Sequence, residues 1–203
     1  EKPNKPDSNL ASMGIYIFNA KLLLDSLRAD AVDQTSEHDF GKNIIPKLLG
    51  DGKALYTYRF EGFWRDVGTI SSYHETSMDL LGEHPEFDLY TKDFPIMSNA
   101  SVCPPHYVGP EGSVSDSLIS NGCRVYGTVR HSILSTGAYV GPRATIEDSV
   151  LLPGAVVKAG ARVVRAILGE ESVVEEGVAL GSVDAAKDTA VIGDHVVVGK
   201  GEE

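Results

Sequence analysis

A fixed rhythm of apolar residues in the second half of the chain constrains its fold more than any other feature. Leu134, Leu151 and Leu168 are 17 residues apart, and two more apolar positions divide each cycle into steps of 6, 6 and 5. Continued to the end of the run, the nine positions are Leu134, Val140, Ile146, Leu151, Val157, Val163, Leu168, Val174 and Leu180. Neither an α-helix nor a hairpin sheet has this period, whereas a coil with three short sides does. The spacing therefore predicts a parallel β-helix built from hexapeptide repeats.

Glycines recur with the same period and predict where the coil turns. Gly137 and Gly154 are 17 residues apart, as are Gly160 and Gly177. Glycine suits a tight corner because it adopts a positive φ without a steric penalty. We expect these four residues to lie at corners between the short strands.

The rest of the chain divides around this solenoid, which we expect to occupy residues 113–203. Residues 181–190 break the repeat and predict a loop, after which Ile192 and Val198, six residues apart, predict a last partial coil. Residues 83–112 are rich in proline and have little periodicity, which is typical of a connector.

Residues 1–82 have the pattern of an α/β domain. The apolar segment 11–20 predicts a buried strand, the alternation over 54–60 predicts a second strand, and helical spacing predicts three helices. The helices are expected over 20–29, 40–49 and 71–81. Two strands are too few to form a complete sheet of this class.

Composition and charge argue against several classes of protein. A net charge of -11 weighs against a general nucleic-acid or membrane-surface binder, which would carry a basic face. No apolar run approaches the roughly 18 residues of a membrane span, and no signal peptide opens the sequence. Cys103 and Cys123 could form one disulfide, but free thiols in a reducing cytoplasm are the simpler interpretation.

The segment Trp64–Thr69 is the densest cluster of chemical groups. Trp64, Arg65 and Asp66 place an aromatic face, a cation and a carboxylate side by side, in a loop that ends in a Gly-Thr pair. An indole can cover the apolar face of a sugar, and a carboxylate can accept from its hydroxyls or hold Mg²⁺ on a phosphate. The alternative is a half-buried tryptophan beside an ion pair between Arg65 and Asp66.

Three further candidates lie in the first 42 residues. Asp39 precedes a helical pattern and could bind a ligand or simply cap the helix. Ser12 opens a predicted strand, and the Lys2-Pro3 pair lies in a polar segment where a lysine is usually only solvated. In the solenoid, His131 and His195 could serve an acyltransferase of the hexapeptide class, or could be polar residues on a coil face.

Taken together, these strings resemble one enzyme family, the bacterial ADP-glucose pyrophosphorylases, also called glucose-1-phosphate adenylyltransferases. The resemblance rests on four short segments, on their order and on the solenoid that follows them, and it covers essentially the whole chain. The strings are Glu1-Lys2-Pro3, residues 11–16, residues 36–47 and residues 64–69.

The resemblance implies an N-terminal Rossmann-like nucleotidyltransferase domain, of which residues 1–82 are the C-terminal part, joined to a left-handed parallel β-helix. It also implies transfer of AMP from ATP to glucose 1-phosphate with Mg²⁺, in glycogen or α-glucan biosynthesis. By resemblance, Lys2 contacts the sugar phosphate and acts in catalysis with Asp66, which is a Mg²⁺ ligand. The residues expected to bind glucose are Glu1, Ser12, Asp39 and Trp64.

The sequence departs from the family pattern at its start. The Gly-rich nucleotide loop and the first metal-binding aspartate of the family have no counterpart in this sequence, so we expect the 203-residue chain to be inactive by itself. The resemblance further implies an allosteric, cytoplasmic homotetramer. A non-catalytic regulatory subunit of the same architecture and a related transferase that uses UTP or GTP remain alternatives.

Overall fold

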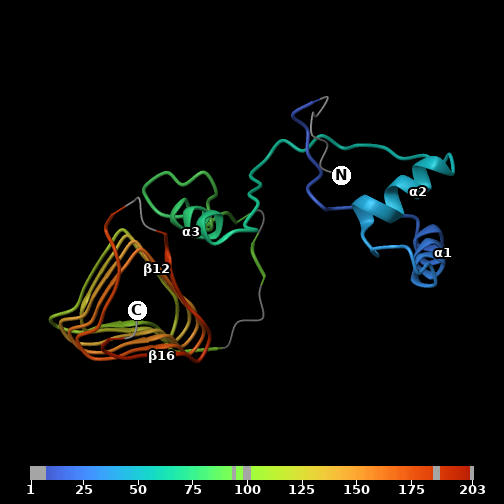
Figure 1. Ribbon diagram of the computed structural model, residues 1–203. Coiled ribbons are helices and arrows are strands. Elements are labelled where there is room, and N and C mark those ends of the chain that lie inside the picture. The colour runs from blue at the N-terminus through green and yellow to red at the C-terminus, as the bar shows by residue number, and fades with distance from the viewer. Residues whose placement is uncertain (1–7, 93–94, 98–101, 185–187, 202–203) are drawn as a thin grey trace. The chain divides into compact units, whose positions relative to one another are not determined.

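A computed structural model describes residues 8–92, 95–97, 102–184 and 188–201 (Figure 1). The chain divides into two compact units, Glu1–Glu61 and Gly62–Glu203. Each unit is described by itself. Among the described residues, no helix is long and apolar enough to cross a membrane.

The second unit is dominated by a stack of three-sided coils, which outlines a triangle when viewed end-on (Figure 1). Its strands form three parallel sheets. The first sheet is β1 (Tyr107–Val108), β4 (Arg124–Val125), β7 (Tyr139–Val140), β10 (Val156–Val157), β13 (Val173–Val174) and β16 (Val197–Val198). The second is β2 (Ser113–Ser115), β5 (Thr128–Arg130), β8 (Thr145–Glu147), β11 (Arg162–Val164) and β14 (Ala179–Gly181). The third is β3 (Leu118–Ile119), β6 (Ile133–Leu134), β9 (Val150–Leu151), β12 (Ala166–Leu168) and β15 (Ala190–Ile192).

The predicted apolar positions fill the inside of this stack. Val140 pairs with Val157, and Val157 with Val174, so each coil places the same position above the last. Eight of the nine predicted residues are fully buried, and Leu180 packs against them partly buried. Complete burial of one such side chain contributes roughly 1.5–3 kcal/mol. The predicted parallel β-helix is therefore confirmed.

The predicted glycine corners are also confirmed. Gly137, Gly154, Gly160 and Gly177 have φ values of 76°, 71°, 66° and 67°. This left-handed conformation is where a side chain at Cβ would be strained.

The solenoid begins before residue 113, and its last coil is longer than the others. β1 pairs with β4 although it lies within the predicted connector 83–112. Near the end, Val173 pairs with Val197, because the chain between β14 and β15 lengthens the last coil. Val198 is buried, as the predicted last partial coil requires.

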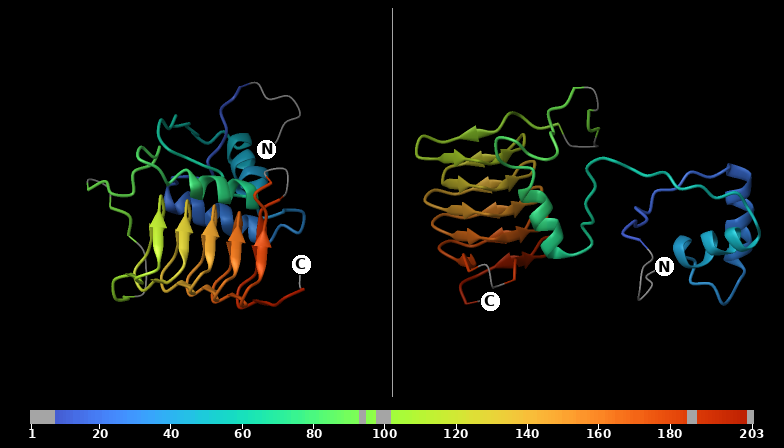
Figure 2. Two further views of the ribbon diagram at one scale, coloured as in Figure 1. Left: turned by 90° about the vertical axis from the view of Figure 1, so that its left-hand side faces the viewer. Right: turned by 90° about the horizontal axis from the view of Figure 1, so that it is seen from above.

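Helix α3 (Ile70–Met78) belongs to the same unit and runs along the stacking direction of the coils (Figure 2). Thr69 caps it: its side chain accepts from the backbone N–H of Ser72 at 3.1 Å, and the two residues form a capping box. In the third sheet, Val150 and Ile167 precede the core residues Leu151 and Leu168, so their side chains face outward from the solenoid. They are nevertheless only 2% and 7% exposed. That stretch of the sheet is therefore covered.

The first unit contains helices but lacks the strands that the sequence predicts. α1 (Ala20–Ala31) begins after Asn19, whose side chain accepts from two backbone N–H groups. A π-helical turn η1 (Phe40–Ile44) leads into α2 (Ile45–Gly50). The predicted helices over 20–29 and 40–49 are confirmed.

The strand predictions over 11–20 and 54–60 are wrong for the structure as described. No strand is formed anywhere between residues 8 and 92, and several apolar side chains of these two segments lie exposed. Ile17 is 100% exposed and Tyr56 is 92% exposed. A strand exists only when its backbone groups pair with a neighbour, and the described residues of this unit supply none. The composition of these segments indicates β-structure, but composition alone does not supply the neighbour.

Candidate functional site

The predicted site residues lie in three parts of the chain. Two of the predicted residues, Glu1 and Lys2, lie outside the described part of the chain. Ser12 and Asp39 belong to the first unit, and Trp64 and Asp66 to the second. The structure therefore describes the site as two separate groups.

Ser12 lies in a tight turn beside an aromatic cluster. Its hydroxyl accepts from the backbone N–H of Gly14 at 3.2 Å and lies 3.1 Å from the hydroxyl of Tyr16. The ring of Tyr16 stacks on Phe40, with ring centroids 5.8 Å apart. Because Phe40 directly follows Asp39, this cluster brings the two predicted glucose-binding segments together within the first unit.

Asp39 has the capping role that the sequence left open. One carboxylate oxygen accepts from the backbone N–H of Lys42 at 2.8 Å, and the Asp39 N–H donates to the Asn43 side chain at 3.2 Å. These bonds fix the carboxylate at the N-terminus of η1. A cap and a ligand contact are compatible, because a carboxylate accepts several hydrogen bonds.

Sequence reasoning missed a buried carboxylate that supports this region. Asp30, near the end of α1, accepts from the Ser36 hydroxyl at 2.6 Å and pairs with His38 Nδ1 at 2.8 Å. The hydrogen bond from Ser36, followed by that from His38, holds the pKa of Asp30 below its usual range. The loop before Asp39 is thereby tied to α1. No local sequence motif predicts this network, because Ser36 and His38 are six and eight residues away from Asp30.

In the second unit, the Trp64–Thr69 segment is held by its neighbours, and Trp64 is 43% exposed. Arg65 does not form the ion pair with Asp66 that the sequence allowed. Its Nη2 lies 2.6 Å from Glu86 and 3.6 Å from Asp79 instead. Asp66 Oδ1 accepts from the backbone N–H of Gly68 at 3.0 Å. The carboxylate is thus oriented by its own loop.

Asp66 opens onto a hollow of about 450 Å³ along α3, lined by Arg65, Asp66, Ser72, Glu75, Thr76 and Asp79. Among the described residues, no three histidine, cysteine or acidic side chains are grouped as a complete metal site. Mg²⁺ nevertheless binds through one or two carboxylates together with substrate phosphates and water. A single exposed carboxylate such as Asp66 fits that kind of site.

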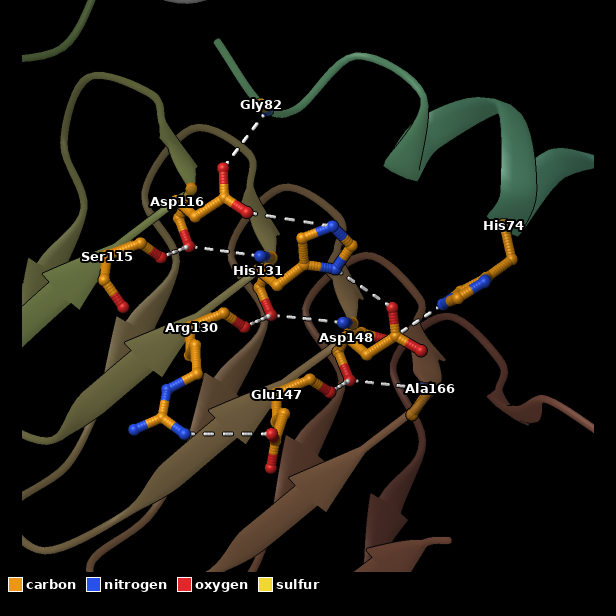
Figure 3. A network of polar contacts seen from close by, with 12 residues as sticks. His74, Gly82, Ser115, Asp116, Arg130, His131, Glu147, Asp148 and Ala166 are labelled. Carbon is orange, nitrogen blue, oxygen red and sulfur yellow. Dashed lines mark hydrogen bonds and ion pairs between the residues drawn. The ribbon is translucent and has the colours of Figure 1, made fainter. Parts of the chain in front are cut away.

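A polar network joins α3 to one corner of the solenoid (Figure 3). His74 Nε2 lies 2.8 Å from the carbonyl oxygen of Asp148. The Asp148 carboxylate pairs with His131 Nδ1 at 3.2 Å, and His131 Nε2 lies 3.9 Å from Asp116. Asp116 in turn accepts from the backbone N–H of Gly82 at 3.1 Å.

The three corner residues of this network share a left-handed conformation. Asp116, His131 and Asp148 have φ values of 44°, 44° and 49°. Aspartate and histidine are among the residues that tolerate this region best. Their spacing of one coil each is visible in the sequence, whereas no local pattern predicts the contact of Asp148 with His74 in α3.

The histidines considered for an acyltransferase lie in ordinary polar contacts. His131 lies between two aspartates, and His195 Nδ1 is 3.3 Å from Glu171 with its side chain 70% exposed. Cys103 and Cys123 are both free, as expected from the sequence.

Comparison with known proteins agrees with both parts of this architecture. The family model described as Nucleotidyl transferase matches residues 1–83, and the one described as GlmU-like, C-terminal hexapeptide matches residues 105–200. The glucose-1-phosphate adenylyltransferase of Acetivibrio thermocellus is 46% identical over 181 residues, which are 89% of this chain and 42% of the relative. This chain belongs to the glucose-1-phosphate adenylyltransferase family.

Other adenylyltransferases match almost the whole chain. The enzyme of Desulfitobacterium hafniense is 41% identical over 205 residues, which are 99% of this chain and 52% of the relative. That of Desulforamulus reducens is 44% identical over 203 residues, which are 97% of this chain and 51% of the relative. The chain spans about half the length of the curated relatives it matches. The family resemblance and the fold class expected from the sequence are both confirmed.

Proposed function

We propose that the natural polypeptide carrying this sequence transfers AMP from ATP to glucose 1-phosphate. The chain contributes the sugar-phosphate side of that site. The observation that carries the proposal is the continuous similarity to glucose-1-phosphate adenylyltransferases across both the nucleotidyl transferase part and the solenoid.

The reaction is an in-line displacement. A phosphate oxygen of glucose 1-phosphate attacks the α-phosphorus of ATP, and the bond from that phosphorus to the α,β-bridging oxygen breaks. ADP-glucose forms and pyrophosphate leaves with the bonding electron pair. Catalysis of this kind depends on positioning and on neutralisation of phosphate charge.

The chain's own residues have distinct roles in this proposal. Lys2 holds the phosphate of glucose 1-phosphate, and Asp66 holds Mg²⁺, which supplies charge neutralisation when bound. Because Asp66 Oδ1 accepts from Gly68, its carboxylate is oriented before any ligand arrives. The residues proposed to bind glucose are Glu1, Ser12, Asp39 and Trp64.

The product, an activated glucose, is a donor for α-glucan synthesis, and we place the enzyme in the cytoplasm as an allosteric homotetramer. We expect the 203-residue chain to be inactive by itself. Light scattering of the natural polypeptide tests the tetramer.

The deciding experiment is an assay of pyrophosphate release by the natural polypeptide with glucose 1-phosphate, Mg²⁺ and each nucleoside triphosphate in turn. The proposal predicts turnover with ATP. Preference for UTP or GTP would instead indicate a related transferase, and no turnover by the homomeric protein with any of them would favour the regulatory subunit.

A further inference from the structure

Helix α3 presents two different faces to two different parts of the second unit. Ser72, Glu75, Thr76 and Asp79 recur at helical spacing and line the hollow that also contains Asp66. His74 lies on the opposite face and is only 4% exposed. The helix therefore lies between the solenoid and residues 65–69, which we call the Asp66 loop.

On the solenoid side, the contact is directional. A carbonyl oxygen can only accept, so His74 Nε2 carries the proton and donates to Asp148 O at 2.8 Å. Asp116, His131 and Asp148 occupy the same corner in successive coils and form a column. Asp148 is held by His131, which points at it from the coil before (Figure 3). Apolar packing permits a helix to slide or turn, whereas such a bond selects one register.

The corner binds the chain again just beyond the helix. The backbone N–H of Gly82 donates to Asp116 Oδ1, eight residues after His74. Two attachments to one column of corner residues fix both the rotation of α3 and its position along the stack.

On the other side, the Asp66 loop is bound to both ends of α3. Thr69, three residues after Asp66, is the N-cap of the helix. Arg65, the residue before Asp66, pairs with Asp79 at the C-cap and with Glu86 beyond it. Any displacement of α3 therefore displaces Asp66.

We propose that His74 is a positioning residue, through which the Asp116–His131–Asp148 corner of the solenoid holds α3 and thereby sets the position of the Asp66 carboxylate. This inference rests on the proposed function for the role of Asp66. It assigns the solenoid a direct part in the geometry of the transfer site.

Replacement of His74 by glutamine or asparagine separates positioning from folding. The glutamine amide nitrogen reaches the position of His74 Nε2 and can donate to the same carbonyl, whereas asparagine is one methylene shorter and cannot. His195→Asn is the matched control, because His195 is also a corner histidine at positive φ beside an acidic residue.

Two readouts are measured. In this chain, hydrogen exchange of the amides of residues 65–69 is expected to accelerate about 10-fold in His74→Asn, with the solenoid amides of residues 145–151 still protected. In the natural polypeptide, His74→Asn is expected to lower kcat about 10-fold and raise the Mg²⁺ concentration for half-maximal rate, while the KM for glucose 1-phosphate stays within about twofold. His74→Gln and His195→Asn are expected to behave like wild type in both.

The inference is overturned if His74→Asn and His74→Gln behave alike, or if exchange of residues 65–69 does not change in His74→Asn. It is also overturned if exchange accelerates but kcat and Mg²⁺ dependence do not move. Absence of nucleotidyl transfer in the wild-type protein would instead remove the proposed function, and the exchange measurement would still decide whether His74 fixes the loop.

Discussion

Asp30 and Cys123 show how the surroundings of one residue change its chemistry. Asp30 is a buried acid that gains hydrogen bonds from Ser36 and His38, so its ionised form is favoured. Cys123 is fully buried inside the solenoid, and burial raises the pKa of its thiol. Each shift leads to a measurable consequence.

Asp30 is expected to stabilise the first unit in a pH-dependent way. A lowered pKa means that the contribution is present above the usual titration range of aspartate and is lost as the pH falls below about 4. Asp30→Asn should therefore speed hydrogen exchange in α1 and residues 33–38 at pH 6, and the difference from wild type should shrink as the pH falls below the usual titration range of aspartate.

Asp25→Asn is the control on the same helix, since the ion pair that Asp25 forms with Lys21 is exposed. Equal effects of the two substitutions at pH 6, or an Asp30 effect that persists at low pH, would contradict the role assigned to Asp30.

Cys123 is expected to resist alkylation. The thiolate is the reactive form, and both burial and the raised pKa disfavour it. Iodoacetamide at pH 8, followed by peptide mass spectrometry, should modify Cys103 first and Cys123 only after unfolding in denaturant. Similar rates at the two residues in the native protein would show that the first solenoid coils open readily.

At the scale of elements, the solenoid is stabilised by its inward-pointing side chains. Val156 and Val157 are neighbours in β10, but only Val157 points into the core and is fully buried. The two valines have the same side chain and adjacent positions in the chain, so replacing each in turn compares the inward with the outward face of the strand.

Val157→Ala is expected to reduce the free energy of unfolding by roughly 1.5–3 kcal/mol, because it removes two buried methyl groups and leaves a cavity. Val156→Ala should cost clearly less. Urea unfolding followed by circular dichroism measures both, and equal losses would mean that the inward and outward faces have been assigned wrongly.

The same elements show what the sequence could predict. The solenoid strands could be placed because each coil repeats the environment of the one before, so a local pattern suffices. Segments 11–20 and 54–60 have strand composition but no strand in the structure, because pairing depends on a distant partner that composition does not specify. For the same reason, the contacts of His74 with Asp148 and of Asp30 with Ser36 and His38 were not predicted.

At the scale of the whole molecule, the solenoid is more than a separate module. Its corner residues bind α3 within one compact unit, and α3 in turn carries the Asp66 loop. The candidate site residues follow from residue types, their order and the family resemblance together, and Asp39 has the capping role considered beside ligand binding.

The proposed role of Asp66 is the centre of this account, and its removal in the natural polypeptide is the most direct test. Loss of a metal ligand removes several kcal/mol of transition-state stabilisation, which corresponds to at least about 100-fold in kcat. Steady-state pyrophosphate release should therefore fall by that factor in Asp66→Asn and stay unchanged in Asp51→Asn, an exposed aspartate after α2. Full activity of Asp66→Asn at all Mg²⁺ concentrations would contradict the account.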